Sequence, residues 1–215
     1  MKKTLFAVAL VTMGLVSAQE FRFGPKGGYS MSSLNMKVPG VTLTKDPMHT
    51  FYVGGLAEYK INDKFAVQGE ALYSALGGKY HINDDEDIFD GMSTKVTLQS
   101  VLVPISAKYF ITEGFSVSAG ASFGLIMSAK AKTVFDGGMN IPGVELEASD
   151  EEDIKDDLNS LNIAPFIGVE YAFENGFFID ARYNYGISEL SKHKDEFTMK
   201  NSFAQVGVGF KFGGN

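Results

Sequence analysis

The chain has 215 residues, with 24 glycines, 18 phenylalanines and no cysteine or tryptophan. Without cysteine there is no disulfide framework, no cysteine metal site and no lipid-modified cysteine, so any membrane attachment must come from the fold itself. The formal net charge of −7 disfavours a nucleic-acid partner, because phosphates are recognised by basic surfaces.

The first eighteen residues have the pattern of a secretory signal peptide. Lys2 and Lys3 precede a short apolar run over 5–16, and Val16-Ser17-Ala18 places small residues at a cleavage site. A transmembrane helix is the alternative, but the apolar run is shorter than the roughly 20 residues that a span requires. We therefore expect residues 1–18 to direct export by the general secretory route and 19–215 to form one domain, whose net charge falls to about −9 without the two lysines.

Apolar and polar residues alternate in eight later segments. In one of them Phe65, Val67 and Tyr73 occupy odd-numbered positions, and the even-numbered positions carry Gln68 and Glu70. Strict alternation places each set on one face of a strand. In chain order, the predicted strands are 21–33, 51–61, 65–74, 100–109, 115–125, 161–173, 177–185 and 204–212.

The connections between these strands alternate between short and long. The short ones are 62–64, 111–114 and 174–176, the last of which contains the hairpin signal Asn-Gly. The long ones are 35–49, 82–93, 129–159 and 188–200. Short turns at one end and long loops at the other are typical of transmembrane barrels. The pattern predicts an all-β fold, an eight-stranded antiparallel up-and-down transmembrane β-barrel.

The apolar face of the predicted strands carries almost no charge, as a lipid-facing surface requires. Its aromatic residues fall into two bands about eight residues apart, as expected for interfacial girdles, whereas a soluble β-sandwich or a lipocalin would enclose them. The band near the short turns comprises Phe21, Phe23, Tyr59, Phe65, Tyr109, Phe110, Phe115, Tyr171, Phe173, Phe177, Phe210 and Phe212, and the second band comprises Phe51, Tyr73, Phe123 and Tyr185.

The polar face would then be enclosed, with Arg22, Lys26 and Lys60 among its cations. An eight-stranded barrel has an interior that side chains can fill, so we expect cross-lumen ion pairs rather than an open pore, although a narrow channel is the alternative. The predicted lumen charge network comprises Glu58, Glu70, Lys108, Glu170, Asp180, Arg182 and Lys211. Pro104 and Pro165 lie mid-strand and predict bulges or local gaps in the ladder.

The outer loops hold the residues that could carry chemistry. His49, His81 and His193 all fall on loops or strand tips, and His193 lies near Ser191 and Asp195, the residue types of an acyl-transfer site. Sequence proximity is not triad geometry, so no catalytic residue is assigned. The acidic runs over 84–90 and 150–157 lack calcium-loop spacing and are interpreted as solvated loops. No metal or cofactor is therefore expected.

Several segments resemble the PorT-like outer-membrane β-barrel family of the Bacteroidetes over nearly the whole mature chain. The segments are Val103-Pro104-Ile105 with Ala107-Lys108-Tyr109-Phe110, then residues 163–171, 178–187 and 203–210. The resemblance implies an outer-membrane barrel with prolines in its strands. It implies no particular role, since such barrels share a scaffold more surely than a function. The chain departs from the usual aromatic ending of such barrels, because Gly213-Gly214-Asn215 follows Phe212.

These observations lead to a functional hypothesis. We expect a monomeric outer-membrane protein of structural or interaction type, not an enzyme, that displays four loops outside the cell. Its expected partners are outer-membrane lipid and lipopolysaccharide, and an extracellular or envelope protein bound through loops 129–159 and 188–200, with no nucleic acid. The alternatives are a narrow pore or a transport or secretion accessory protein, and a lipid-modifying enzyme.

Overall fold

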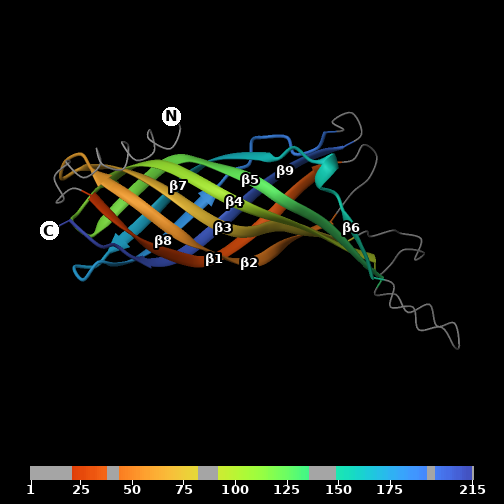
Figure 1. Ribbon diagram of the computed structural model, residues 1–215, viewed down its shortest axis with the longest axis horizontal. Helices are drawn as coiled ribbons and strands as arrows, with labels where there is room; N and C mark the ends of the chain where they lie inside the picture. Colours follow the sequence, from red (N-terminus) through yellow and green to blue (C-terminus); the bar gives the residue numbers. More distant parts are fainter. Residues whose placement is uncertain (1–20, 38–43, 82–91, 136–148, 193–196, 215) are drawn as a thin grey trace, which may run out of the picture.

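A computed structural model describes residues 21–37, 44–81, 92–135, 149–192 and 197–214 (Figure 1). The strands are β1 (Phe21–Lys37), β2 (Thr44–Lys60), β3 (Phe65–His81), β4 (Met92–Phe110), β5 (Phe115–Phe135), β6 (Ser149–Asp153), β7 (Leu161–Ala172), β8 (Phe177–Asn184) and β9 (Thr198–Phe210). One short 3-10 helix, η2 (Lys155–Asp157), follows β6. Within these ranges, no helix is long and apolar enough to cross a membrane.

Eight of the strands form a closed antiparallel ring. The order of neighbours is β4-β3-β2-β1-β9-β8-β7-β5, and the pairing of β4 with β5 closes it. Each strand of the ring neighbours the strand before or after it, apart from the insertion of β6, and β1 pairs with β9. The predicted eight-stranded up-and-down barrel is confirmed, and β6 is a ninth, short strand added to the outer part of β5.

Short turns close one end of the barrel by local hydrogen bonds. The side chain of Asn62 accepts from the backbone N–H groups of Lys64 and Phe65, both at 2.9 Å. The side chain of Asn175 accepts from the N–H of Phe177 at 3.0 Å, and the next residue, Gly176, has a φ of 88° that favours glycine. These turns lie at the end where β1 starts and β9 finishes (Figure 1).

The apolar side chains at alternate positions of the strands face outward, as predicted. Ile167 is 70% exposed and Val206 59%, although both lie within regular ladders, and Phe51, beside a register shift of β2, is 79% exposed. Most of the predicted aromatic girdle also points outward, but Phe110 does not: it is 4% exposed and lies inside the barrel. The reason is its parity, because Phe110 follows the outward-facing Tyr109 and therefore shares the inward face of Lys108.

The strands are longer than predicted at the outer end. Residues 129–135 belong to β5, 149–153 form β6, and 155–157 form η2, so the described parts of the predicted loop 129–159 consist mostly of strand and helix. Likewise β9 starts at Thr198, inside the predicted loop 188–200, and β2 starts at Thr44, inside the loop 35–49. Outside the bilayer a strand need not alternate strictly, so its outer end lacks the pattern on which the boundaries were based.

The strand prolines interrupt the ladder only slightly. The pairing of β3 with β4 skips from Gly69↔Ile105 to Leu72↔Leu102, which leaves the predicted gap at Pro104. Pro165 still pairs with Ala121 and marks the point beyond which β7 has no regular ladder with β8. Neither proline carries a bulge. The register shifts lie elsewhere, between positions 47 and 52 of β2 and between positions 99 and 100 of β4.

The outer half of the barrel encloses an apolar core that the sequence reasoning did not predict. Above the charged region lies a cluster of Tyr52, Leu72, Leu76, Leu102, Ala164 and Phe203. Farther out lies a second buried cluster of Leu34, Tyr80, Val96, Leu98, Ile126, Ala129, Leu158, Leu190 and Met199. Leu158 and Leu190 come from the segments that follow η2 and β8, so these segments fold over the outer mouth and close it.

Candidate functional site

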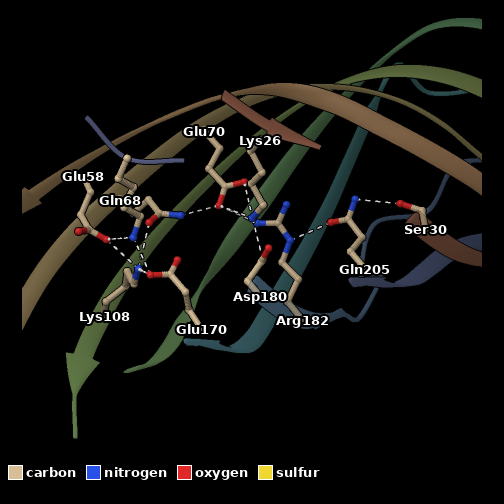
Figure 2. A network of polar contacts seen from close by, with 11 residues as sticks. Lys26, Ser30, Glu58, Gln68, Glu70, Lys108, Glu170, Asp180, Arg182 and Gln205 are labelled. Atoms are coloured by element: carbon tan, nitrogen blue, oxygen red, sulfur yellow. Dashed lines mark hydrogen bonds and ion pairs between the residues drawn. The ribbon is translucent and has the colours of Figure 1, made fainter. Parts of the chain in front are cut away.

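Two lysines and two glutamates form a square of ion pairs in the lumen, and Figure 2 labels three of them, Glu58, Lys108 and Glu170. Lys108 from β4 donates to Glu58 at 2.7 Å and to Glu170 at 2.6 Å. Lys211, just past β9, reaches the same two carboxylates at 2.7 and 2.6 Å. All four side chains are at least nine-tenths buried, so each charge is neutralised by partners from other strands rather than by solvent.

A second cluster lies next to this square. Lys26 from β1 contacts Asp180 at 2.7 Å and Glu70 at 3.3 Å. Arg182 from β8 donates to Glu70 at 3.0 Å and, through Nε, to Gln205 at 2.8 Å. Figure 2 shows Lys26 and Arg182 both directed at the Glu70 carboxylate, so this single group joins strands β1, β3 and β8.

Gln68 connects the two clusters into one network. Its side-chain oxygen accepts from Lys108 at 3.2 Å, and its amide donates to Glu70 at 2.7 Å. At the outer end, Gln205 donates to Ser30 at 3.0 Å. The structure therefore brings together all seven residues of the predicted lumen network: Glu58, Glu70, Lys108, Glu170, Asp180, Arg182 and Lys211.

The prediction of the network omitted Lys26 and the neutral linkers Gln68, Gln205 and Ser30. Lys26 completes the charge balance, because the network then holds four cations and four carboxylates. The alternation in the sequence places Lys26 on the inward face. Its ion-pair partners, however, depend on the register in which the strands pair when the barrel closes. Two further inward cations lie at the margin: Arg22 is 4.0 Å from Glu58, and Lys60 lies over the ring of Phe110.

Small residues create the space that the large ionic side chains fill. Arg182 is opposite Gly168 on β7, where an added β-carbon would lie 3.0 Å from the Cβ of Arg182. Asp180 is opposite Gly207 on β9, where an added β-carbon would lie 2.8 Å from the carboxylate. The sequence thus alternates large charged and minimal residues on neighbouring strands, which lets a narrow barrel hold eight charges.

The network leaves little free volume. One cavity of about 10 Å³ is bordered by Gln68, Glu70, Lys108, Glu170, Asp180 and Arg182. This is room for about one water molecule. Arg182 Nη2, Asp180 Oδ1 and Tyr52 Oη are buried without a hydrogen-bond partner among the described residues. The cavity and these atoms could accommodate a bound water, but they offer no continuous path for ions.

Aromatic rings close the network on the short-turn side. Phe178 is fully buried, and Lys211 Nζ lies 4.9 Å from its ring centre. Lys60 and Lys108 lie 4.9 and 5.7 Å from the ring centre of Phe110. Such cation–π contacts stabilise a desolvated cation. The ionic region therefore has aromatic rings on one side and the apolar clusters on the other.

The structure does not assemble the other candidate sites. His49 is exposed on β2 and shares a hydrogen bond with Tyr29, on which its ring stacks. His193 and Asp195 lie outside the described residues, as does the acidic run over 84–90, and Ser191 is buried in the outer rim. In the parts of the chain that the structure describes, no three His, Asp or Glu side chains are grouped as a metal site.

The arrangement of these residues supports a structural role for the network. Every lysine and carboxylate of the network is engaged by an opposite charge, and the cavity is bordered by the hydroxyl residues Ser106 and Ser118 but by no histidine that could activate them. Removing one member of such a buried network leaves an uncompensated charge, which typically costs roughly 3–5 kcal/mol. The network fixes the register of strands distant in the chain and fills the barrel.

Comparisons with known proteins agree with this architecture. A family model described as outer membrane protein beta-barrel domain matches residues 17–192. Among solved structures, Ail, the attachment invasion locus protein of Yersinia pestis, is similar over 90% of this chain and 99% of its own, with 21% identity and a TM-score of 0.50. Neisserial surface protein A is similar over 88% and 97%, with 16% identity and a TM-score of 0.47. No curated protein sequence matches the chain.

Proposed function

This chain belongs to the outer membrane protein beta-barrel domain family, and we propose that it is a structural and interaction protein that presents its outer end to the cell exterior. The barrel is the anchor, with lipid and lipopolysaccharide around its apolar face. The partner is an extracellular or envelope protein that contacts the outer end. We propose that the chain acts as a monomer, exported by the general secretory route.

The observation that carries this proposal is the contrast between the two ends of the barrel. The short-turn end consists of tight turns held by single side chains such as Asn62 and Asn175. The outer end is elaborated: it carries β6 and η2, and it is packed around Leu158 and Leu190. Loops held on a rigid scaffold are where binding residues concentrate, so the strand, helix and packing that the structure describes at the outer end support a role in recognition.

The filled lumen argues against the alternative of a pore. The cavity of about 10 Å³ beside Arg182 is enclosed by the ion-pair network on the inside, and the two apolar clusters lie between it and the outer mouth. The lipid-modifying alternative has no assembled triad among the described residues to support it. Within the family, we assign the chain to the PorT-like barrels of the Bacteroidetes on the strand motifs described above. Such barrels share a scaffold more surely than a function, so this assignment gives the chain no role in secretion.

Site-directed labelling on intact cells tests this proposal. The chain contains no cysteine, so single cysteines can be introduced without background labelling. Asp156→Cys in η2 should react with a membrane-impermeant maleimide, whereas Asp63→Cys in a short turn should react only after the outer membrane is permeabilised. Labelling of Asp63→Cys alone on intact cells would show that the orientation is reversed.

A further inference from the structure

Strand β6 provides a free sheet edge. Among the residues that the structure describes, it is the last strand in the order of the sheet and pairs only with β5, from Lys130↔Asp153 to Val134↔Ser149. The pairing is continuous, without a register shift, and β6 contains no proline. Proteins block an exposed edge with bulges, prolines, shortness or charge; β6 has no bulge or proline, but it has five residues of which four are acidic, so it can pair only with a short strand of opposite charge.

The register shows which backbone groups face this edge. The N–H of Ile154 donates to the carbonyl of Ala129 at 2.9 Å, so these residues form a hydrogen-bonded pair in continuation of the ladder. Hydrogen-bonded pairs alternate along an antiparallel ladder, so Glu152 also faces β5. The N–H and C=O groups of Glu151 and Asp153 therefore point away from β5, and no residue in the described ranges bonds to them.

The side chains of the same two residues set the charge of the edge. Glu151 and Asp153 share one face of the strand because they are two positions apart. They lie opposite Lys132 and Lys130 on β5, and Glu151 Oε1 accepts from Lys130 Nζ at 2.5 Å. β5 thus shows the kind of strand that β6 accepts: an extended segment with lysines at alternate positions.

We propose that the free edge of β6 binds an extended basic segment, with Lys or Arg at alternate positions, as an additional antiparallel strand. Backbone hydrogen bonds to residues 151 and 153 would supply the pairing, and the two carboxylates would select the charge. This rests on the proposed function and specifies the chemistry of the partner. A second copy of the chain does not fit this edge, because β6 against β6 would place carboxylates opposite carboxylates.

A peptide copied from the chain itself is the probe. A fluorescent peptide with the sequence of residues 128–134, which contains Lys130 and Lys132, is titrated against the full chain in detergent micelles and followed by fluorescence anisotropy. Saturable binding is expected. The same peptide N-methylated at both lysines keeps its charge but loses two backbone donors, and it should not bind. Equal binding of the methylated peptide would reduce the interaction to charge attraction and overturn the proposed strand pairing.

Variants of the protein, rather than of the peptide, test the role of the two carboxylates at this edge. Glu151→Gln with Asp153→Asn should weaken binding about tenfold, because two cross-strand charge pairs are lost. The control, Glu152→Gln with Asp156→Asn, removes the same number of charges from residues outside that face and should bind within about twofold of the parent. Circular dichroism checks that all chains are folded barrels.

Either of two further results would also overturn the proposal: equal weakening by both variants, or no binding to the parent at millimolar peptide. The assay uses purified protein and is independent of cellular orientation. If the peptide does not bind, the cysteine-labelling experiment that tests the proposed function is therefore unaffected.

Discussion

The hydroxyl of Tyr52 on β2 lies directly over the bare backbone of Gly207 on β9, with β1 between the two strands. A β-carbon at Gly207 would lie 2.0 Å from Tyr52 Oη and 3.1 Å from Tyr52 Cζ. The ring is 3% exposed and belongs to the apolar cluster above the charge network. This contact ties β2 to β9, and only a glycine at 207 allows it.

Gly207→Ala should therefore destabilise the barrel. The added methyl group would displace Tyr52 or push on Asp180, and overpacking of this kind costs roughly 1–3 kcal/mol. Because the chain has no tryptophan, unfolding in urea is best followed by far-UV circular dichroism in vesicles.

Gly69→Ala is the matched control, because an added β-carbon there meets nothing within 4 Å. It should leave stability unchanged or raise it by about 0.4–1 kcal/mol through the unfolded state. Equal loss of stability in both variants would mean that glycine is needed in these strands for a reason other than the contact with Tyr52.

Glu58→Gln should be strongly destabilising. The Glu58 carboxylate is fully buried and accepts from both Lys108 and Lys211 at 2.7 Å. Neutralising it leaves two buried ammonium groups to share Glu170, so we expect a loss of roughly 3–5 kcal/mol in the free energy of unfolding. Glu151→Gln removes a carboxylate from an exposed ion pair and should cause no measurable change.

A double variant separates the pairing energy from the burial of charge. Glu58→Gln together with Lys211→Met should cost less than the sum of the two single variants, because neither charge is then left without its partner. Additive losses would indicate that Glu58 and Lys211 are not coupled as their 2.7 Å contact requires.

The barrel should not conduct ions. The lumen is occupied by the charge network and by two buried apolar clusters, and its cavity measures only about 10 Å³. Purified protein in planar bilayers should give no stable channel openings, and Leu102→Ala, which leaves the ion pairs intact, should remain silent. Stable single-channel steps from the parent would contradict the closed lumen and favour the pore alternative.

Much of this architecture can be predicted from the sequence, because a bilayer imposes strict alternation on the strands within it. The outward parity of Ile167 and Val206 and the inward parity of Lys108 and Arg182 follow from that constraint alone. The pairing of particular charges, such as Lys26 with Asp180, could not be predicted, because partners across the lumen depend on the register in which β1 meets β9.

The outer end escaped prediction for a different physical reason. The five residues of β6 include four acids and show no alternation; they are a strand because β5 offers Lys130 and Lys132 opposite them. Leu72 occupies an inward position of the predicted strand 65–74, but alternation did not indicate an apolar cluster there, and Leu76 lies beyond the predicted end of that strand.

The pair formed by Glu151 and Lys130 should respond to pH. The hydrogen bond from Lys130, together with its positive charge, holds the pKa of the Glu151 carboxyl below its ordinary value. A lowered carboxyl pKa stabilises the folded state above the unfolded-state pKa, and this contribution is lost as the pH falls through the folded-state value. β6 should therefore loosen on acidification.

Carbon-13 NMR titration of Glu151 measures this directly. The carboxyl should titrate below the range of an unperturbed glutamate in the parent chain, and it should return to that range in Lys130→Met. An unchanged pKa in Lys130→Met would show that the pair does not form in solution.

The central physical claim is that the apolar face meets lipid while the polar face is enclosed. Its most direct test is quenching of a fluorophore by brominated acyl chains in vesicles, with single cysteines at Ile167 and Val208 on the outer face and at Ser122 on the inner face. We predict strong quenching at Ile167→Cys and Val208→Cys, and a Ser122→Cys that resists labelling until the barrel is unfolded. Ready labelling of Ser122→Cys in the folded protein, with little lipid quenching at Ile167→Cys and Val208→Cys, would contradict the account.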